Sequence, residues 1–167
     1  MTRSRIYIVG FMGAGKTTIG WLLAKKLGWK FVDLDHEVEK AEKRHIAAIF
    51  RDSGEPYFRD LERKYLQYHS TMDQAVIALG GGTFADSANR TLANSSGLTV
   101  WLKVSFATVV DRVKMDGTRP LFESRIEAER LLMSREEFYK SALLHTVVDG
   151  RRPAEIVDDI VGALGNL

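Results

Sequence analysis

Eight residues near the start of the chain have the types and the spacing of a phosphate-binding loop. Residues 10–17 read G-x-x-x-x-G-K-[ST] and follow the apolar run at residues 6–9. Glycine allows a positive φ, so successive backbone N–H groups can point into one anion-sized nest. In this motif the ammonium of Lys16 is placed to contact the β- and γ-phosphates of a nucleotide, and the hydroxyl of Thr17 to ligate Mg²⁺. The residues expected to bind the nucleotide here are Gly13, Ala14, Gly15, Lys16, Thr17 and Thr18.

A glycine-rich turn that happens to precede a lysine is the alternative. At average composition, the four fixed positions coincide by chance in about one chain of this length per few hundred. Chance also requires neither a strand before the loop nor a helix after it. Residues 18–27 have apolar side chains at helical spacing and end at Gly28, a typical helix terminator. We therefore interpret residues 10–17 as a nucleotide phosphate site, with the positive end of the helix dipole facing the phosphates.

Two carboxylates, Asp33 and Asp35, stand at the end of a second apolar segment. Ligands of an open parallel sheet bind at the carboxyl ends of its strands, which is where this pair would lie. One carboxylate could face the metal through water while the other reaches an acceptor hydroxyl. An N-cap for the following helix is the alternative role, and Asp35 is also suited to it. The third strand, at residues 75–79, ends without an acidic residue, so Asp33 is the better candidate for a metal-side carboxylate.

Three later features are candidates for binding the group that accepts the phosphate. Residues 80–82 are glycines that would let a substrate lie flat against the backbone, or that form no more than a flexible turn. Arg59 and Glu62 lie three residues apart, hence on one face of a helix. They form either a surface ion pair of little consequence or a guanidinium that Glu62 aims at a substrate carboxylate, and helix position does not decide between the two. Arg135 is a third cation, but its position alone does not indicate a function.

Residues 115–124 combine an arginine with a glycine and a proline directly after an expected helix. A plain surface connection is one explanation. A mobile lid is favoured, because phosphoryl transfer must exclude water.

The composition is that of an ordinary globular protein and excludes several classes of function. The chain has 167 residues, of which 45% are hydrophobic and 28% charged, and a net charge of +2; this predicts one compact domain. It has no lysine- or arginine-rich block and no apolar run of membrane-spanning length, so we expect neither a nucleic-acid partner nor a membrane. The absence of cysteine excludes disulfides and thiolate chemistry and fits a cytoplasmic enzyme, which we expect to be a monomer.

Short apolar segments alternate with longer helical ones, which predicts βαβ units and a parallel sheet. The expected strands cover residues 6–10, 30–33, 75–79, 98–103 and 146–148. The expected helices cover residues 16–27, 36–43, 46–51, 57–70, 86–94, 106–114, 127–144 and 153–164. Residues 52–56 should break a helical pair, and the three tryptophans should lie in or beside the core.

Taken in order, these motifs closely resemble the shikimate kinase family over nearly the whole chain. The phosphate loop alone is shared by very many nucleotide-binding enzymes, whereas the order D-x-D, G-E-x-x-F-R-x-x-E, G-G-G and R-P-L is far more specific. These motifs lie at residues 33–35, 54–62, 80–82 and 119–121, followed by Arg135 and Tyr139. The resemblance implies a three-layer α/β/α kinase fold with a five-stranded parallel sheet of order 2-3-1-4-5. It also implies ATP and Mg²⁺, and phosphorylation of the 3-hydroxyl of shikimate.

The same resemblance implies roles for the acceptor side of the site. Asp35 is similar in position to the residue that contacts the substrate hydroxyls, as base or hydroxyl orienter. Arg59 and Arg135 resemble the carboxylate clamp, and the Gly81 N–H is also expected to contact substrate. The acceptor-binding helical segment covers about residues 34–62. The full acceptor set is Asp35, Arg59, Glu62, Gly80, Gly81, Gly82 and Arg135.

On the nucleotide side, the resemblance makes Asp33 a water-mediated Mg²⁺ partner beside Thr17. Arg119 resembles a lid arginine that reaches the transferring phosphates, with the lid at about residues 115–126. Arg112 and residues 151–153 resemble the walls of the adenine site, and Arg152 is the expected contact, with an alignment uncertain by one residue. The expected catalytic residues are Lys16, Asp35 and Arg119.

Two other functions remain open from the residues alone. A related kinase could act on a sugar acid or a nucleoside monophosphate, because a guanidinium binds phosphate as well as carboxylate. A nucleotide-binding module without catalysis would be expected to have lost Asp35 or the lid arginine, and both are present. A GTP switch is disfavoured, since the chain has no Asn-Lys-x-Asp segment to read guanine.

Overall fold

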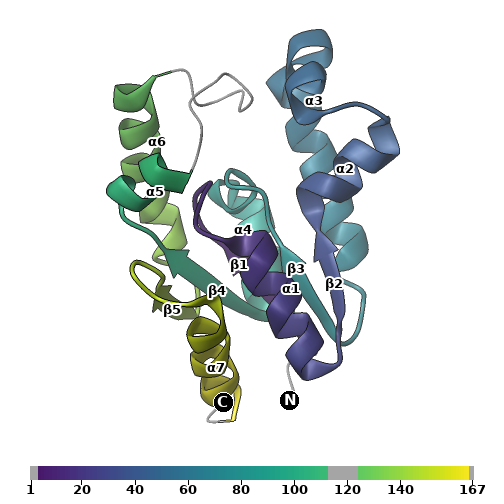
Figure 1. Ribbon diagram of the computed structural model, residues 1–167. Helices are drawn as coiled ribbons and strands as arrows, with labels where there is room; N and C mark the ends of the chain where they lie inside the picture. Colours follow the sequence, from purple (N-terminus) through teal and green to yellow (C-terminus); the bar gives the residue numbers. More distant parts are fainter. Residues whose placement is uncertain (1–3, 113–123, 166–167) are drawn as a thin grey trace.

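The computed structural model describes residues 4–112 and 124–165. Its centre is a sheet of five parallel strands in the order β2-β3-β1-β4-β5 (Figure 1). The strands are β1 (Arg5–Val9), β2 (Lys30–Asp33), β3 (Ala75–Ala78), β4 (Leu98–Lys103) and β5 (Leu144–Val147). The predicted fold class and strand order are therefore confirmed.

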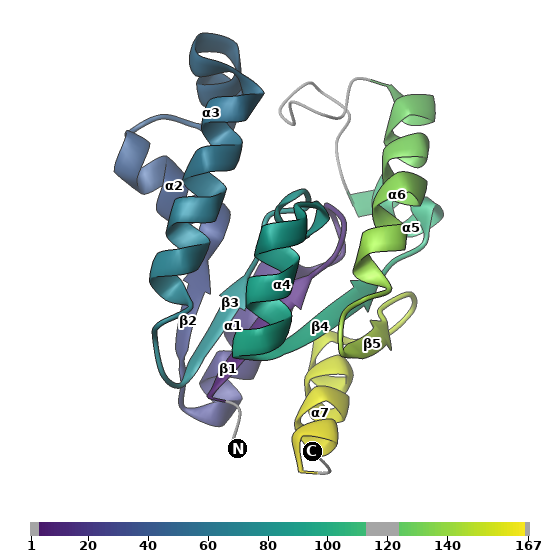
Figure 2. The ribbon, with the colours of Figure 1, turned by 180° about the vertical axis from the view of Figure 1, so that it is seen from behind.

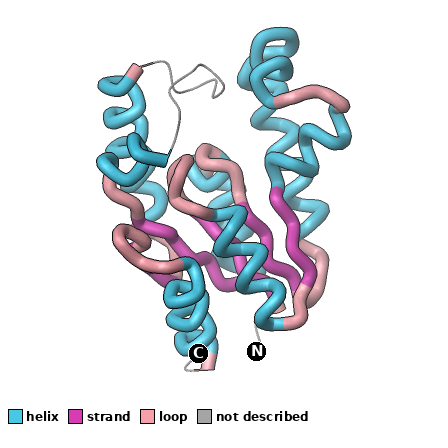
Figure 3. The backbone as a smooth tube through the Cα atoms, in the orientation of Figure 1, coloured by secondary structure: helices cyan, strands magenta, loops and turns pink. Residues whose placement is uncertain are grey.

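Helices cover both faces of this sheet (Figure 3). The helices are α1 (Lys16–Leu27), α2 (Leu34–Glu42), α3 (Ile46–His69), α4 (Ser87–Ser96), α5 (Phe106–Arg112), α6 (Arg125–Tyr139) and α7 (Pro153–Leu164), with a 3₁₀ turn η1 (Thr83–Ala85). In Figure 1, α1 and α7 lie in front of the sheet, and Figure 2 shows α4 on the opposite face. No helix in the described part of the chain is long and apolar enough to cross a membrane.

The central strands β1, β3 and β4 are buried because helices cover both faces of the sheet, so they are mostly apolar along their length rather than alternating. The edge strands β2 and β5 are partly exposed. Every residue of β3 is buried, and in β1 only the first residue is partly exposed. A second, smaller cluster lies between α2 and α3 and consists of Val38, Ile49, Phe58 and Leu61. The acceptor-binding segment expected at about residues 34–62 thus has a small apolar core of its own.

The expected interruption at residues 52–56 is present as a kink inside α3. Gly54 has φ 84° and ψ 165°, a conformation outside the helix that favours glycine, and Pro56 follows it in the next helical turn. The N-cap role considered as the alternative for Asp33 and Asp35 is present at the start of α2. Asp33, not Asp35, accepts a hydrogen bond from the N–H of His36, so α2 begins at Leu34 and Asp35 lies in its first turn.

Two predicted boundaries near the C-terminus are wrong. The helix expected to reach residue 144 ends at Tyr139, because the Lys140–Ala142 backbone N–H groups turn back onto the carbonyls of the last helical turn. Strand β5 then starts at Leu144, which pairs with Val100 of β4. The turn η1 was not predicted. Trp21 is also not a core residue: half of its surface is exposed, whereas Trp101 is buried as expected.

Candidate active site

A pocket of about 1100 Å³ lies at the carboxyl ends of β1, β2 and β3. Most of the residues predicted from separate parts of the sequence meet there. They are Gly13, Gly15, Lys16, Thr17, Thr18, Asp33, Asp35, Arg59, Glu62, Gly80, Gly81, Gly82 and Arg135. The pocket therefore joins the phosphate loop to the candidate acceptor residues, as the order of the motifs predicts.

The phosphate loop has the backbone geometry of an anion site. Gly15 has φ 94° and caps the N-terminus of α1, which places the first free N–H groups of the helix toward the pocket. The Lys16 ammonium donates to the carbonyl of Phe11, 3.0 Å away, and is thereby folded back over the loop. Ala14 is buried and takes no part in the pocket wall.

The metal-side candidates Thr17 and Asp33 are in direct contact. The Thr17 hydroxyl donates to a carboxylate oxygen of Asp33 at 2.6 Å. Mg²⁺ prefers oxygen ligands and usually keeps several waters, with one or two protein groups and substrate phosphates completing the shell. In residues 4–112 and 124–165, no group of three or more His, Cys, Asp or Glu could hold a metal ion. The hydroxyl–carboxylate pair fits a Mg²⁺ ion that is bound together with a nucleotide, not one held by protein alone.

Arg59 and Glu62 form a partly buried pair and not the surface ion pair considered as the alternative. The Arg59 guanidinium donates to Glu62 at 2.5 Å, and Glu62 is only 1% exposed. The other Glu62 oxygen accepts from the hydroxyl of Thr83 in η1, also at 2.5 Å. Burial lowers the pKa of Arg59, but the carboxylates of Glu62 and Glu55 outweigh it, so the pKa lies above its ordinary value. Arg59 therefore stays charged at the pocket wall.

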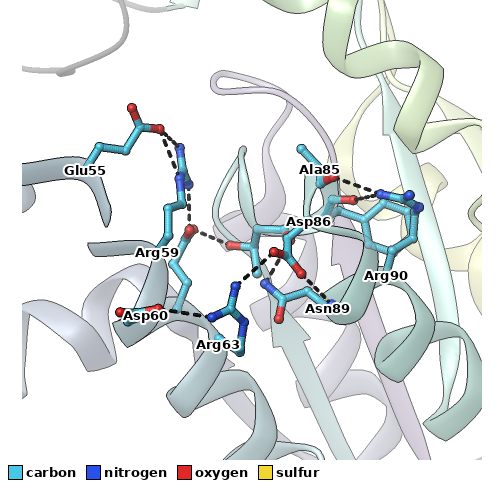
Figure 4. A network of polar contacts seen from close by, with 11 residues as sticks. Glu55, Arg59, Asp60, Arg63, Ala85, Asp86, Asn89 and Arg90 are labelled. Carbon is cyan, nitrogen blue, oxygen red and sulfur yellow. Dashed lines mark hydrogen bonds and ion pairs between the residues drawn. The ribbon is translucent and has the colours of Figure 1, made fainter. Parts of the chain in front are cut away.

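Glu55 also binds Arg59, from the start of the second half of α3 (Figure 4). One Glu55 oxygen accepts from Nε at 3.2 Å and from Nη2 at 3.0 Å of the same guanidinium. Glu55 is half-exposed, whereas Glu62 is fixed in the interior. Of the two carboxylates on Arg59, Glu55 is thus the one with freedom to move away.

The three glycines at residues 80–82 are needed because functional side chains lie against their backbone. A Cβ at Gly80 would lie 2.6 Å from Asp35 Oδ1, and one at Gly82 would lie 2.5 Å from Arg59 Nη1. At Gly81 the neighbour is Arg135 Nη1, at 3.1 Å. Any side chain at residues 80 or 82 would displace a candidate acceptor-binding group. The close approach favours the functional explanation of this turn over a merely flexible one.

Arg135 is a buried cation that faces the pocket from α6. It is 6% exposed, and its guanidinium lies over the Phe11 ring at 5.9 Å from the centroid. Burial lowers the pKa of Arg135. The Tyr139 hydroxyl and the Glu62 carboxylate interact favourably with it, but no aspartate or glutamate in the described segments forms a direct ion pair with it, and Arg59 adds a second positive charge nearby. A buried charge without an ion-pair partner of its own is costly, and Glu62 is already paired with Arg59, so this arrangement is best satisfied by an anionic ligand.

The expected adenine contacts are only partly brought to the site. Arg112, at the end of α5, donates to the carbonyl of Gly13 at 3.1 Å and so reaches the phosphate loop. Arg152 is mostly exposed, pairs with Glu155 at 2.7 Å, and does not line the pocket. Arg151 pairs with Asp159 at 2.5 Å. Arg119 and nearly all of the expected lid lie outside the described residues.

Sequence reasoning assigned no role to Thr83, Glu55 or Tyr139, all of which contact the site. Thr83 holds Glu62, Glu55 holds Arg59, and the Tyr139 hydroxyl donates to the carbonyl of Gly81. Each lies next to a recognised motif. Tyr139 and Glu55 carry a positional signal, because Tyr139 follows Arg135 by four residues and Glu55 precedes Arg59 by four, so each shares a helix face with its arginine. Thr83 carries none.

Comparison with known proteins gives consistent matches. The family model for shikimate kinase matches residues 12–165. A shikimate kinase of Persephonella marina is 42% identical over 160 residues, covering 95% of this chain and 98% of the relative. A shikimate kinase of Sulfurihydrogenibium sp. is 43% identical over 157 residues, covering 93% and 95%.

Solved structures agree with these matches. Shikimate kinase from Acinetobacter baumannii in complex with shikimate superposes with a TM-score of 0.94 at 31% identity, covering 99% of this chain and 94% of that one. The Aquifex aeolicus shikimate kinase gives a TM-score of 0.88 at 36% identity, covering 97% and 96%. A deoxyadenosine kinase from M. mycoides with bound dATP gives 0.63 at 22% identity over 96% of this chain and 99% of that one, which is a likeness of fold alone.

Proposed function

The chain belongs to the shikimate kinase family, and from this we infer its reaction. It is an ATP-dependent kinase that phosphorylates the 3-hydroxyl of shikimate and yields shikimate 3-phosphate and ADP. Mg²⁺ is its metal cofactor. The reaction belongs to the biosynthesis of aromatic amino acids. What the residues of this chain do in that reaction is the substance of our proposal.

On the nucleotide side, we propose that residues 13–18 bind the phosphates of ATP. The Lys16 ammonium and the N-terminus of α1 offset their negative charge. Thr17 would hold Mg²⁺ directly and Asp33 through water, a role that their 2.6 Å contact supports. When bound, Mg²⁺ neutralises charge on the phosphate oxygens. Arg112 would contact the nucleotide beside the phosphate loop, whereas the roles of Arg119 and Arg152 rest on the family resemblance alone.

On the acceptor side, we propose that Arg59, Arg135 and the Gly81 N–H bind the carboxylate of shikimate. Asp35 lies in the same pocket and is the group proposed to orient the 3-hydroxyl and take its proton. Catalysis then consists mainly of positioning and charge neutralisation, as is usual for phosphoryl transfer. Glu62 is proposed to act through Arg59, because it lies beneath the guanidinium in the protein interior.

The single observation that carries this acceptor assignment is Arg135. Its guanidinium is buried at the pocket, beside a second arginine, and none of the described acidic residues forms a direct ion pair with it. An acceptor with a carboxylate supplies the missing charge, and the planar fork of arginine suits a bidentate carboxylate. A neutral alcohol supplies no negative charge to these arginines.

Shikimate and an analogue with a primary alcohol in place of the carboxylate test this assignment. We expect wild-type enzyme to prefer shikimate strongly, and Arg135→Lys to reduce that preference in kcat/KM at least tenfold, because lysine keeps the charge but not the fork. Arg130→Lys, on the exposed face of the same helix, is the matched control and should change nothing. A preference that Arg135→Lys leaves intact would refute the carboxylate clamp.

We further propose that the enzyme acts as a monomer, a single domain over residues 1–167, in the cytoplasm. One chain supplies every pocket residue in the described ranges, which supports a complete site within the monomer. The need for metabolic ATP supports the cytoplasm. Light scattering of the purified enzyme at micromolar concentration tests the first point, and a dimeric mass would contradict it.

A further inference from the structure

The turn at residues 80–82 owes its shape to hydrogen bonds on its carbonyl groups. The Gly80 carbonyl accepts from the Thr83 N–H at 3.1 Å, and the Gly82 carbonyl accepts from the Ala85 N–H at 3.1 Å. Both bonds are local, within η1 and the turn before it. The middle carbonyl, that of Gly81, accepts instead from the side-chain hydroxyl of Tyr139, which lies 58 residues further along the chain.

Holding a carbonyl also holds the N–H on the other side of the same peptide. The peptide group is planar and its N–H points away from its C=O. The bond to Gly80 therefore directs the N–H of Gly81, and the bond from Tyr139 directs the N–H of Gly82. Three consecutive glycines allow many backbone conformations, so the orientation of these donors depends on such bonds more than it would in another sequence.

Tyr139 is well placed to hold the turn firmly. Its side chain is fully buried, with its ring centroid 6.0 Å from that of Trp101. Burial raises the pKa of Tyr139, so the phenol stays a neutral donor, and its oxygen also interacts with the Arg135 guanidinium. It lies one helical turn after Arg135, and the Arg135 guanidinium itself lies close to Gly81.

We propose that Tyr139 is a positioning residue for the acceptor. Its hydroxyl fixes the Gly81–Gly82 peptide and holds the turn in its position next to the Arg135 guanidinium. The proposal rests on the acceptor site described above. It makes α6 responsible for two parts of that site, the cation of Arg135 and the orientation of the Gly81–Gly82 peptide in the turn. Both lie against the phosphate loop, Arg135 over the Phe11 ring and Gly81 near the Gly10 carbonyl, but neither is among the proposed nucleotide-binding residues. The effect of losing the hydroxyl should therefore fall mainly on the acceptor.

Tyr139→Phe removes one oxygen and leaves the packing in place. Tyr7→Phe is the matched control, because Tyr7 is also fully buried and its hydroxyl makes one hydrogen bond, at 2.7 Å to Ser96, far from the pocket. We expect Tyr139→Phe to raise the KM for shikimate about tenfold, the scale of one lost hydrogen bond to a buried acceptor, with the KM for ATP within twofold of wild type. Tyr7→Phe should leave both KM values within twofold. Equal changes in the two variants, or equal rises in both KM values for Tyr139→Phe, would overturn the proposal.

Amide NMR without any acceptor separates this proposal from the assigned reaction. In Tyr139→Phe we expect the Gly81 and Gly82 amide signals to shift and broaden relative to wild type, and in Tyr7→Phe to stay unchanged. Unchanged glycine signals in Tyr139→Phe refute the positioning role whatever the enzyme phosphorylates. A wild-type enzyme that does not turn over shikimate refutes the proposed function, and the NMR result still decides the role of Tyr139.

Discussion

Alanine at position 82 would place a methyl group against the guanidinium of Arg59. The added Cβ would lie 2.5 Å from Nη1, 2.7 Å from Nη2 and 2.9 Å from Cζ of that side chain. The backbone itself accepts alanine, since Gly82 has φ −99° and ψ −13°. The clash therefore has to be relieved by Arg59, whose tip must move about 0.9 Å to reach ordinary van der Waals distance.

Arg59 cannot make this move freely, because Glu62 and Glu55 hold its guanidinium. Misplacing a substrate-binding group by about 1 Å costs up to about 100-fold in rate. We therefore expect Gly82→Ala to lower kcat/KM for shikimate by about 10- to 100-fold, equivalent to about 1.4–2.7 kcal/mol. The KM for ATP should not change, because the phosphate loop is not touched.

Gly162→Ala is the control for the general effect of replacing glycine by alanine. A Cβ at Gly162, within α7, meets nothing within 4 Å. This variant should keep wild-type kinetics and gain about 0.5–1 kcal/mol of stability from the better helix propensity of alanine. Steady-state kinetics with each substrate varied in turn, together with urea unfolding, measure both effects. A Gly82→Ala enzyme with kcat/KM for shikimate within twofold of wild type would refute the close packing of Arg59 on this turn.

Three further predictions concern single side chains. Asp35→Asn should bind ATP as wild type does by calorimetry but lose at least about 100-fold in turnover, as expected for a lost general base; full turnover would exclude that role. Glu55→Gln should lower the KM for shikimate severalfold, because a neutral amide competes less for Arg59 than the carboxylate 3.0 Å away; a raised KM would mean that Glu55 supports binding. Burial lowers the pKa of His69 despite Glu37 at 3.6 Å, so below about pH 6.5 the unfolded chain takes up a proton that the native state resists. The free energy of unfolding should then fall from pH 7.5 to pH 5.5, more steeply than in His69→Leu; equal slopes in urea titrations would exclude His69 as the cause.

The parts of this molecule that the sequence predicts are those set by local patterns. The phosphate loop is a contiguous motif, and the buried strands are short apolar runs separated by helical segments, so the parallel sheet follows from the chain itself. The position of Asp33 beside Thr17 also follows, because Asp33 ends β2 and Thr17 follows the loop after β1, and the carboxyl ends of parallel strands lie at the same edge of the sheet.

The parts that local patterns cannot predict depend on contacts between distant segments. Helix spacing could not decide whether Arg59 and Glu62 are exposed, because the burial of Glu62 depends on Thr83, which is 21 residues away and lies in an unpredicted 3₁₀ turn. The role of Tyr139 depends on a partner 58 residues earlier. The end of α6 was missed for a related reason. Residues 140–147 leave the helix to form a turn and to pair with β4 as β5. Helical spacing in the sequence does not show that pairing with β4 is available to these residues.

The most direct test of the central assignment is the product formed from ATP, Mg²⁺ and shikimate. The enzyme should form ADP and one phosphorylated product in equal amounts, with phosphorus-coupled NMR signals that place the phosphate on the 3-hydroxyl. Sugar acids and nucleoside monophosphates, tested at the same concentration, should give far less ADP. No shikimate-dependent ADP, or faster turnover of a nucleoside monophosphate, would contradict the assignment of the acceptor pocket.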